Sequence, residues 1–330
     1  MVISAIIPAF NAGTEVRECL AALIGANQYV DEILVVDDAS HDDTATVAAA
    51  AGARVLRLDR NLGPAGARNA GAAASRGDVL WFVDADVVVA PDAAARVARL
   101  FALQPDLAAV FGSYDTQPRA TGVVSQYRNL LHHYVHQQAA VDASTFWAGC
   151  GAVRRAAFED VGGFDPRPSW HFIEDIELGY RLRAAGHRIL LDKDLRATHL
   201  KRWTLRGVLR TDTFFRAAPW TRLIRRTATA PADLNLGGTQ RVSVALAGLA
   251  TACAILTLFA GAFAVGAAAS LLALLAVNSA LYRFFYRERS FTFMVASLPL
   301  HVLYFLSCGA GFLYGCVTPA TDSSLGHPKK

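Results

Sequence analysis

The sequence predicts an α/β domain over its first 200 residues, followed by a basic segment and a tail embedded in a membrane. In the first part, apolar runs typical of strands alternate with Ala-rich helical stretches, which favours βαβ units and a mostly parallel sheet with helices on both faces. Residues 1–200 carry 18 Lys and Arg against 24 Asp and Glu. By contrast, residues 242–282 contain no charged side chain, and these 41 residues are enough for two membrane spans.

The elements of the α/β part follow one another at the spacing of βαβ units. The expected strands are residues 2–7, 32–36, 54–58, 79–83 and 107–111. The expected helices lie near residues 14–25, 42–51, 65–75 and 91–103. In a parallel sheet of this kind, the ligand binds beyond the carboxyl ends of the strands. The residues that follow each strand are therefore the first candidates for a functional site.

Two of these strand ends carry paired carboxylates. Asp37 and Asp38 follow the second strand, and Asp84 and Asp86 follow the fourth. Carboxylates gathered at one edge repel each other unless a cation or a basic group lies between them. Mg²⁺ is commonly held by one or two carboxylates together with substrate phosphates. As an alternative, Asp37 and Asp38 could simply cap the following helix, but capping explains Asp84 and Asp86 poorly because apolar runs flank them.

Several other classes of protein are disfavoured. The first strand is not followed by GxGxxG, and the chain has no GxxxxGK[ST], which argues against a dinucleotide dehydrogenase and a P-loop enzyme. The five cysteines show no CxxC or Cys/His spacing, so neither a disulfide framework nor a structural zinc is expected. The basic residues are concentrated in one strip beside an acidic domain, which is unlike a nucleic-acid-binding protein. The first ten residues lack the basic start of a signal peptide and are expected to form a buried strand.

Six short motifs occur in an order that resembles a known family. They are Pro8-Ala-Phe-Asn11, Val36-Asp-Asp-Ala-Ser40, Asn61-Leu-Gly63 with Ala67-Arg-Asn-Ala-Gly71, Asp84-Ala-Asp86, Gly162-Gly-Phe-Asp165 and Glu174-Asp175. Together they resemble glycosyltransferase family 2, whose members have the GT-A fold, and the resemblance covers roughly residues 1–200. It implies a nucleotide-sugar donor, with a UDP-sugar favoured over a GDP-sugar, and a divalent cation, either Mn²⁺ or Mg²⁺.

The resemblance also implies which residues surround the nucleotide of the donor. Asp38 would face the base, with Pro8 and Phe10 nearby and Asn11 in the same motif. Arg68, on the helix after Gly63, would support this pocket. The alternative for Arg68 is an arginine on the surface of an Ala-rich helix.

Further along the donor, the resemblance implies a sugar and metal site. Asp84 would reach the ribose, and Asp86 would hold the divalent cation on the diphosphate. Gly149 belongs to a glycine-rich segment that would lie beside the donor sugar. His199 stands where some GT-A enzymes have a third metal ligand, and a structural role for this single histidine is the alternative.

The adjacent carboxylates Glu174 and Asp175 are expected to carry the catalytic step. They open a predicted helix over residues 173–185, and the helix dipole stabilises carboxylates in a first turn. One alternative is therefore a helix start that the two charges merely stabilise. The resemblance implies instead that Asp175 is the general base, which takes a proton from the acceptor hydroxyl in one inverting displacement. Glu174 would position the acceptor or the loop.

Residues 201–240 are expected to form a basic amphipathic segment and a linker at a membrane surface. Its first 26 residues, 201–226, contain eight basic residues and one acidic residue interleaved with aromatic ones. Such a composition is typical of helices that lie among anionic headgroups. Pro219 is expected to divide the segment into two short helices. The candidate contacts with the membrane or the acceptor are Arg202, Trp203, Arg206 and Trp220.

A membrane domain is expected over residues 241–317, with a tail over residues 318–330. The expected spans are about residues 242–262, 267–284 and 291–317. Buried helices of a soluble domain are the alternative, but the chain offers no partner domain large enough to cover them. The basic residues beside the spans place the catalytic domain in the cytoplasm, which predicts a multi-pass protein of the inner (plasma) membrane.

These observations predict a non-processive, metal-dependent, inverting glycosyltransferase that moves a sugar to a lipid or lipid-linked acceptor at the cytoplasmic face of the membrane. Residues His199-Leu-Lys-Arg-Trp203 lack the Gln of the QxxRW motif that processive polysaccharide synthases carry. A polyprenyl-phosphate glycosyltransferase is the nearest alternative. A catalytically silent membrane scaffold or binding subunit is the alternative from another class. The expected partners are the donor, the acceptor and an anionic membrane, without nucleic acid, and a homo-oligomer is compatible with the sequence.

Overall fold

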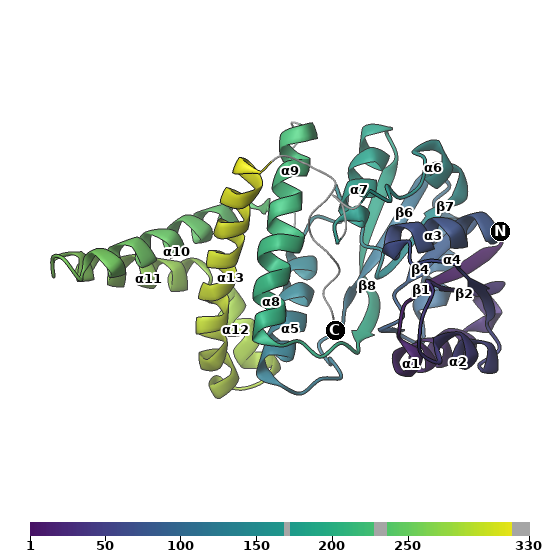
Figure 1. Ribbon diagram of the computed structural model, residues 1–330, viewed down its shortest axis with the longest axis horizontal. Coiled ribbons are helices and arrows are strands. Elements are labelled where there is room, and N and C mark those ends of the chain that lie inside the picture. The colour runs from purple at the N-terminus through teal and green to yellow at the C-terminus, as the bar shows by residue number, and fades with distance from the viewer. Residues whose placement is uncertain (168–171, 228–235, 319–330) are drawn as a thin grey trace. The chain divides into compact units, whose positions relative to one another are not determined.

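The computed structural model describes residues 1–167, 172–227 and 236–318, and its chain divides into two compact units (Figure 1). Residues 1–120 and 139–201 belong to an α/β unit, apart from the four residues outside the described ranges. The remaining described residues belong to a helical unit.

The boundary between the units differs from the expected one in a single segment. Residues 121–138 were expected in the first domain, but they group with the helical unit. The physical reason is their apolar face, since Tyr127, Leu130 and Leu131 are buried in the core of that unit. Apart from its first residue, the expected tail lies outside the described residues.

An eight-stranded sheet forms the centre of the α/β unit. Its strands are β1 (Ile3–Ala9), β2 (Glu32–Asp37), β3 (Arg54–Arg57), β4 (Val79–Val83), β5 (Val87–Val89), β6 (Leu107–Tyr114), β7 (Cys150–Arg154) and β8 (Arg188–His199). Their order across the sheet is β3-β2-β1-β4-β7-β6-β8-β5. β7 runs antiparallel to both β4 and β6, and β5 runs antiparallel to β8, whereas the other pairings are parallel. The sheet is thus mixed, with parallel pairings in the majority.

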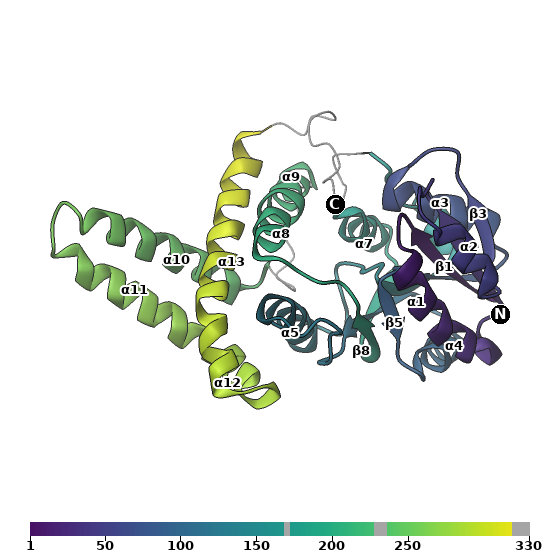
Figure 2. The ribbon, with the colours of Figure 1, turned by 60° about the horizontal axis from the view of Figure 1, so that its bottom comes forward.

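Helices cover both faces of this sheet, as expected (Figure 2). They are α1 (Gly13–Gly25), η1 (Asn27–Tyr29), α2 (Thr44–Ala50), α3 (Gly63–Ala74), α4 (Ala93–Leu103), α6 (Arg155–Asp160) and α7 (Glu174–Ala184). Successive strand residues point to opposite faces. Trp81 joins the core that α1 and α4 cover. Its neighbour Phe82 meets Phe158 and Phe164, so it lies on the other face.

Helix α3 packs very closely on the sheet because a glycine faces the strands. A Cβ atom built on Gly71 would lie 2.4 Å from a methyl carbon of Ile6 on β1 and 2.9 Å from one of Val36 on β2. A residue with a side chain would therefore push the helix away from the sheet. The close approach holds the start of α3 at the carboxyl edge of the strands, where the candidate residues lie.

The helical unit contains eight helical segments among the described residues. They are α5 (Val123–Gln138), α8 (Leu205–Arg210), η3 (Thr211–Ala217), α9 (Ala218–Thr227), α10 (Gly238–Leu256), α11 (Phe263–Val277), α12 (Ser279–Glu288) and α13 (Phe291–Val317).

The expectation of two short helices separated at Pro219 is wrong. Residues 205–227 form one continuous helical run in which the segment before Pro219, η3, is a π-helix. Proline removes one hydrogen bond from a regular helix and clashes with the preceding turn. The wider π-helical turn accommodates this defect. In addition, the Thr221 hydroxyl donates to the Ala217 carbonyl at 2.7 Å, which satisfies an acceptor in the same turn.

Among the described residues, two helices are long and apolar enough to cross a membrane, namely α10 and α13. Helices α11 and α12 pass the same test only as a pair bent by 60°. The span expected at about residues 267–284 is therefore bent at Asn278. Its side-chain amide donates to the Ser243 hydroxyl at 2.8 Å and to the Leu274 carbonyl at 2.9 Å, which fixes the break.

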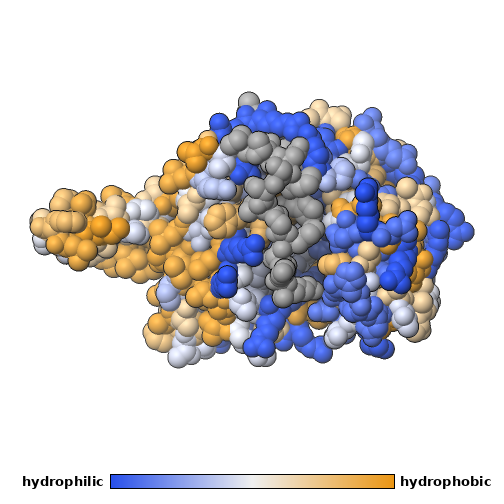
Figure 3. All heavy atoms as spheres, viewed as in Figure 1, coloured by the Kyte–Doolittle hydropathy of each residue, from blue (hydrophilic) through white to orange (hydrophobic). Residues whose placement is uncertain are grey.

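The surface of α10 and α11 is strongly apolar (orange in Figure 3). Leu258 and Phe259, between the two helices, are each 83% exposed. Only 11% of the most apolar stretch of α10 is buried inside the protein. An apolar surface of this extent marks a site of contact with a membrane or another protein.

The basic residues 201–226 contribute to packing within the helical unit as well as to its surface. Trp220 is 5% exposed, so the expectation that it contacts a membrane surface is wrong. Arg225 donates to the Cys316 carbonyl at 2.6 Å, and Arg222 donates to the Thr318 hydroxyl at 2.6 Å. These two positive charges therefore stabilise the C-terminal end of α13, where the helix dipole is negative.

A buried ion pair joins α5 to η3 within the helical unit. The two Nη atoms of Arg128 lie 2.7 and 3.0 Å from the two carboxylate oxygens of Asp212. The exposed fractions of the two side chains are only 9% and 2%. The guanidinium also lies over the ring of Trp203, 5.6 Å from its centre.

We predict that Asp212→Ala destabilises the protein by about 3–5 kcal/mol, because it leaves the buried Arg128 charge without its partner. The thermal unfolding midpoint in detergent should fall accordingly. The double variant R128M/D212L removes both charges and should recover most of the loss. If Asp212→Ala alone unfolds at the wild-type temperature, the pair does not stabilise this unit.

Candidate active site

The turn between β4 and β5 presents two carboxylates at the carboxyl edge of the sheet. Asp84 and Asp86 have side chains that are 32% and 31% exposed. The Asp84 amide donates to the carbonyl of Gly149 at 3.2 Å, which ties this turn to the segment that precedes β7. Both carboxylates therefore reach solvent while their backbone is held in place.

Asp86 lies beside His199, the last residue of β8. The Asp86 Oδ2 and His199 Nε2 atoms are 3.6 Å apart, and the His199 ring stacks on Tyr114 with ring centres 4.4 Å apart. Burial acts to raise the pKa of Asp86, but the polar interaction with the His199 ring outweighs it and lowers that pKa. Asp86 is accordingly held in its charged form.

This arrangement fits a divalent cation with two protein ligands. Carboxylate oxygens and imidazole nitrogens bind such ions at roughly 2.0–2.2 Å, so two ligand atoms 3.6 Å apart can share one ion. Within the described residues there is no group of three or more His, Cys, Asp and Glu side chains that could hold a metal. A cation here would need further oxygen ligands from a bound substrate.

The residues expected around the nucleotide base lie at the ends of β1 and β2. Asp38 is 3% exposed, and its two carboxylate oxygens accept from the amides of Leu62 and Gly63 at 2.7 and 2.9 Å. It therefore caps the start of α3 by accepting from the amides of the N-cap residue Leu62 and of the first helical residue.

The loop after β1 stands beside Asp38. Pro8 is half-buried, and Phe10 is 40% exposed with its ring in a T-shaped arrangement with the His41 ring. Asn11 adopts a left-handed backbone (φ 49°) that suits Asn, and its side-chain oxygen accepts from the His41 amide at 2.8 Å. The loop is thus closed by Asn11 while the Phe10 ring remains open to a ligand.

Arg68 connects two of the candidate carboxylates. It is 5% exposed, and it lies 2.7 Å from Asp84 Oδ1 and 2.7 Å from Glu174 Oε1. The sequence did not predict these partners, and the alternative of a surface arginine is wrong. Glu174 is 5% exposed, and its second oxygen is buried without a hydrogen-bond partner among the described residues.

Asp175 is the second residue of α7, next to Glu174. Its carboxylate accepts from the amide of Ile176 at 2.8 Å and from the amide of Ala148 at 3.2 Å. Burial raises the pKa of Asp175 to about 7, with a further rise from the Glu174 charge that Arg68 and the two amides partly offset. Such a pKa suits a general base at neutral pH.

The segment before β7 links Asp175 to the donor-side carboxylates. The Ala148 amide donates to Asp175, and the carbonyl of the next residue, Gly149, accepts from the Asp84 amide. A Cβ atom on Gly149 would lie 2.5 Å from the ring of Trp147, so a glycine is required there. Trp147 in turn meets the ring of Tyr114 edge-on, at 4.8 Å between centres.

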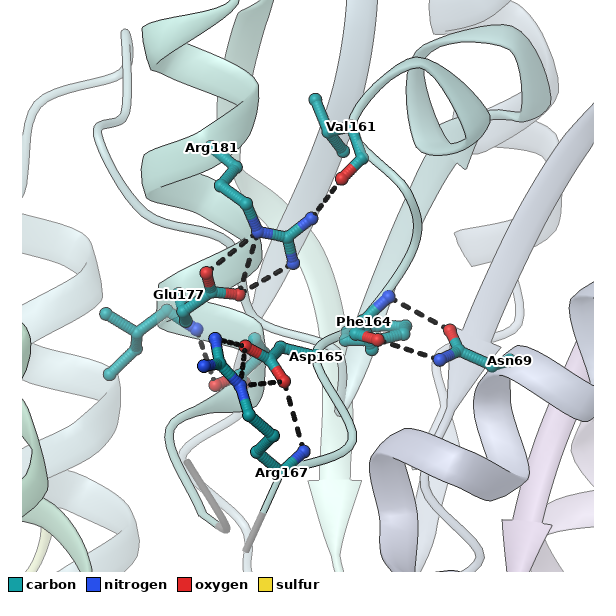
Figure 4. A network of polar contacts seen from close by, with 9 residues as sticks. Asn69, Val161, Phe164, Asp165, Arg167, Glu177 and Arg181 are labelled. Atoms are coloured by element: carbon teal, nitrogen blue, oxygen red, sulfur yellow. Dashed lines mark hydrogen bonds and ion pairs between the residues drawn. The ribbon is translucent and has the colours of Figure 1, made fainter. Parts of the chain in front are cut away.

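A network of polar contacts anchors the loop that precedes α7 (Figure 4). Asn69 of α3 accepts from the Phe164 amide at 2.9 Å and donates to the Phe164 carbonyl at 2.7 Å. Arg181 of α7 pairs with Glu177 and donates to the carbonyl of Val161. Phe164 is therefore held from α3, and Val161 is held from α7.

The structure brings most of the expected site residues to one edge of the α/β unit. Arg202, Trp203, Arg206 and Trp220 belong to the helical unit instead. Tyr114, Ala148 and Asn69 were missed. Tyr114 ends β6, so the rule that ligands bind at strand ends could have identified it. Asn69 stands in one of the six motifs, whereas the backbone amide of Ala148 leaves no signal in a sequence.

The sequence of this chain is similar to those of known glycosyltransferases. Residues 4–162 match the family described as Glycosyl transferase family 2. Over 95 residues the chain is 36% identical to the succinoglycan biosynthesis protein ExoO of Rhizobium meliloti, which is 28% of this chain and 27% of that protein. Over 235 residues it is 25% identical to the O-antigen chain rhamnosyltransferase RfbN of Salmonella typhimurium, which is 67% of this chain and 74% of that protein.

A solved structure resembles nearly the whole chain. The mannosyltransferase PcManGT from Pyrobaculum calidifontis, in complex with GDP-Man and Mn²⁺, matches with a TM-score of 0.60 and 18% identity. The match covers 94% of this chain and 87% of that one. At this identity the similarity shows the fold alone, and that fold is GT-A.

We predict that Gly149→Ala disturbs the segment that binds both Asp84 and Asp175, because the added methyl group would displace the Trp147 ring. The emission of the tryptophans should shift, and the thermal midpoint should fall by the few degrees that about 1–3 kcal/mol of overpacking causes. Gly25→Ala is the matched control, since a Cβ atom there meets nothing within 4 Å. Equal effects of the two substitutions would contradict the tight contact.

Proposed function

Through its residues 4–162 this chain belongs to glycosyltransferase family 2, and we propose that it is a metal-dependent, inverting, non-processive enzyme acting at a membrane. It would transfer a sugar from a nucleotide-sugar donor to a lipid or lipid-linked acceptor at the cytoplasmic face of the inner membrane. The observation that carries this proposal is the position of Asp175, whose carboxylate accepts from the amide of Ala148, while the next residue, Gly149, accepts from the amide of Asp84.

The donor is proposed to lie along the carboxyl edge, from the β1 loop to Asp86. The open ring of Phe10 supports a stacking contact with the base. The solvent-facing carboxylates Asp84 and Asp86 support contacts with the ribose and with a cation on the diphosphate. Gly149 lies next to Asp84 in space, which supports a place for the donor sugar beside it.

The residues that would hold the divalent cation are Asp86 and His199. A cation bound there would neutralise charge on the nucleoside diphosphate that leaves. The chain's own contribution is to orient the His199 ring beside Asp86 by stacking it on Tyr114. The Mn²⁺ and GDP-Man named for the mannosyltransferase of the same fold support this choice of cofactor and donor class.

Asp175 is proposed to activate the acceptor. Its carboxylate takes the proton of the acceptor hydroxyl as that oxygen forms a bond to the anomeric carbon and the bond from this carbon to the phosphate oxygen breaks. The two amides from Ile176 and Ala148 hold the carboxylate in place but leave each oxygen a lone pair. The second oxygen of Glu174 is buried without a hydrogen-bond partner among the described residues, and it would accept from a hydroxyl of a substrate that reaches it.

A membrane location is supported by the helical unit. Residues 242–282 have no charge, α10 and α13 are long enough to span, and the side chains between α10 and α11 are exposed and apolar. The exposed Arg202 and Arg206 stand before and at the start of α8. These positive charges support attraction to anionic headgroups or to the phosphate of a lipid-linked acceptor.

The mechanism predicts different defects for two substitutions. Asp175→Asn keeps the shape but removes the proton acceptor, so turnover should fall by roughly 10²–10⁴-fold. Donor affinity, measured by calorimetry with Mn²⁺ present, should persist. Asp86→Ala should weaken donor binding as well as turnover. Asp106→Asn, at a side chain that is 68% exposed, is the control. Near-normal turnover of Asp175→Asn would show that another group is the base.

The raised pKa of Asp175 predicts the pH dependence of the wild-type reaction. Because only the ionised carboxylate accepts a proton, the rate should rise with pH through about 7 and level off above it. Released nucleoside diphosphate measured from pH 5 to 9 tests this. A rate that is flat across that range would contradict a base with this pKa.

The surface arginines predict a dependence on lipid charge. R202Q/R206Q should lower activity on vesicles rich in anionic lipid, since each basic residue near such a surface is worth about 1 kcal/mol. Activity in neutral detergent should change little. R17Q/R99Q replaces two exposed arginines of the α/β unit and serves as the control. An equal loss in both media would indicate a structural role for Arg202 and Arg206.

A further inference from the structure

Arg68 is a buried arginine between two carboxylates that come from distant parts of the chain. Its guanidinium lies 2.7 Å from Asp84, which follows β4, and 2.7 Å from Glu174, which begins α7. The ring of Phe164 lies beside the guanidinium, 5.4 Å from its carbon to the ring centre. A single planar group with fixed donor directions thus sets the separation of the two carboxylates.

Contacts along helix α3 fix the position of the Arg68 side chain. Gly71 lets the helix sit directly on β1 and β2, and Asp38 caps its first turn. The residue after Arg68, Asn69, binds both backbone groups of Phe164. The helix that carries Arg68 is therefore fixed to the sheet, to the β2 end and to the loop before α7.

The charges around Arg68 give it a second effect on α7. Glu174 and Asp175 are adjacent carboxylates in one helical turn, and their like charges repel each other. Arg68 binds Glu174 directly, and its positive charge also acts on Asp175. Without Arg68, the first turn of α7 would keep the buried carboxylate of Glu174 beside the partly buried one of Asp175 and lose the cation that offsets them.

We propose that Arg68 is a positioning residue, which holds the start of α7, and with it Asp175, at a fixed place relative to the donor-side carboxylate Asp84. This inference rests on the proposed function of Asp175 and goes beyond it. It also differs from the role expected for Arg68 beside the nucleotide base, because both of its Nη atoms are engaged by the carboxylates.

The two roles predict different kinetic defects in Arg68→Gln. Positioning predicts that turnover at saturating donor falls by roughly 10²-fold, the usual cost of misplacing a reacting group. The acid limb of the pH–rate profile should also move up by about one unit, because the Arg68 charge that favours ionised Asp175 is gone, while burial and Glu174 still oppose ionisation. The affinity for UDP or GDP with Mn²⁺, measured by calorimetry, should change only a few-fold.

Two matched variants separate positioning from general damage to the fold. Arg68→Lys keeps the positive charge but loses the planar guanidinium that binds two carboxylates at once. The acid limb of its pH–rate profile should therefore stay near that of the wild type, while turnover falls. Arg155→Gln removes an arginine that donates to the carbonyls of Ala72, Ser75 and Gly77, away from the carboxylates. It should lower the thermal midpoint and leave the pH limb in place. A large loss of nucleotide affinity in Arg68→Gln, with an unmoved pH limb, would overturn positioning in favour of the base-pocket role.

Hydrogen exchange of the full chain in detergent tests the inference without any activity. The amides of Ala148 and Ile176 donate to Asp175, so they report whether α7 begins in its place. In Arg68→Gln both should exchange at least about tenfold faster, as loss of a hydrogen bond to a charged group allows, and Arg155→Gln should not change them. Unchanged exchange in Arg68→Gln would overturn the proposal. If the wild type released no nucleoside diphosphate from any donor, the proposed function would fail, while this measurement would still decide the role of Arg68.

Discussion

The crowding of carboxylates at one edge of a sheet is the constraint on which the site depends. Asp84, Asp86, Glu174 and Asp175 reach this edge from a strand end and a helix start, and their like charges disfavour the arrangement. Three kinds of group in the α/β unit offset this repulsion. Arg68 lies between Asp84 and Glu174, His199 lies beside Asp86, and backbone amides donate to Asp175. The compensation is uneven, since Asp175 keeps a raised pKa and Asp86 a lowered one. Two carboxylates with opposite shifts are suited to different roles.

Small residues make this compensation possible. Gly71 lets α3 approach the sheet, so that Arg68 reaches the strand ends while its stem is buried. Gly149 leaves room for the Trp147 ring, so that the segment before β7 can bind Asp84 and Asp175 at the same time. In the helical unit, buried polar contacts hold the helices together beneath an apolar outer surface. These contacts are the Arg128–Asp212 ion pair and the hydrogen bonds of the Asn278 side chain.

The sequence predicted the parts of the fold that local pattern determines. Strands β1 to β4 and helices α1 to α4 follow from hydrophobic periodicity, and Asp84 and Asp86 were found because they follow a strand. Pairings over long separations were not predictable from one sequence. Arg68 and Glu174 are 106 residues apart, and β7 enters the sheet antiparallel between β4 and β6. The bend at Asn278 and the π-helix before Pro219 depend on tertiary contacts, and composition alone could not reveal them.

The central claim is that Asp175 accepts a proton in one direct displacement and never bonds to the sugar. The anomeric configuration of the product tests this most directly, because a single displacement inverts the configuration of the donor and two successive displacements retain it. The wild-type enzyme in detergent would be given a donor of known α-configuration with Mn²⁺ and an acceptor that supports release of nucleoside diphosphate, and the first-formed product would be examined by proton NMR. The account predicts a β-linked product. An α-linked product would contradict the role of Asp175 as a general base for direct attack.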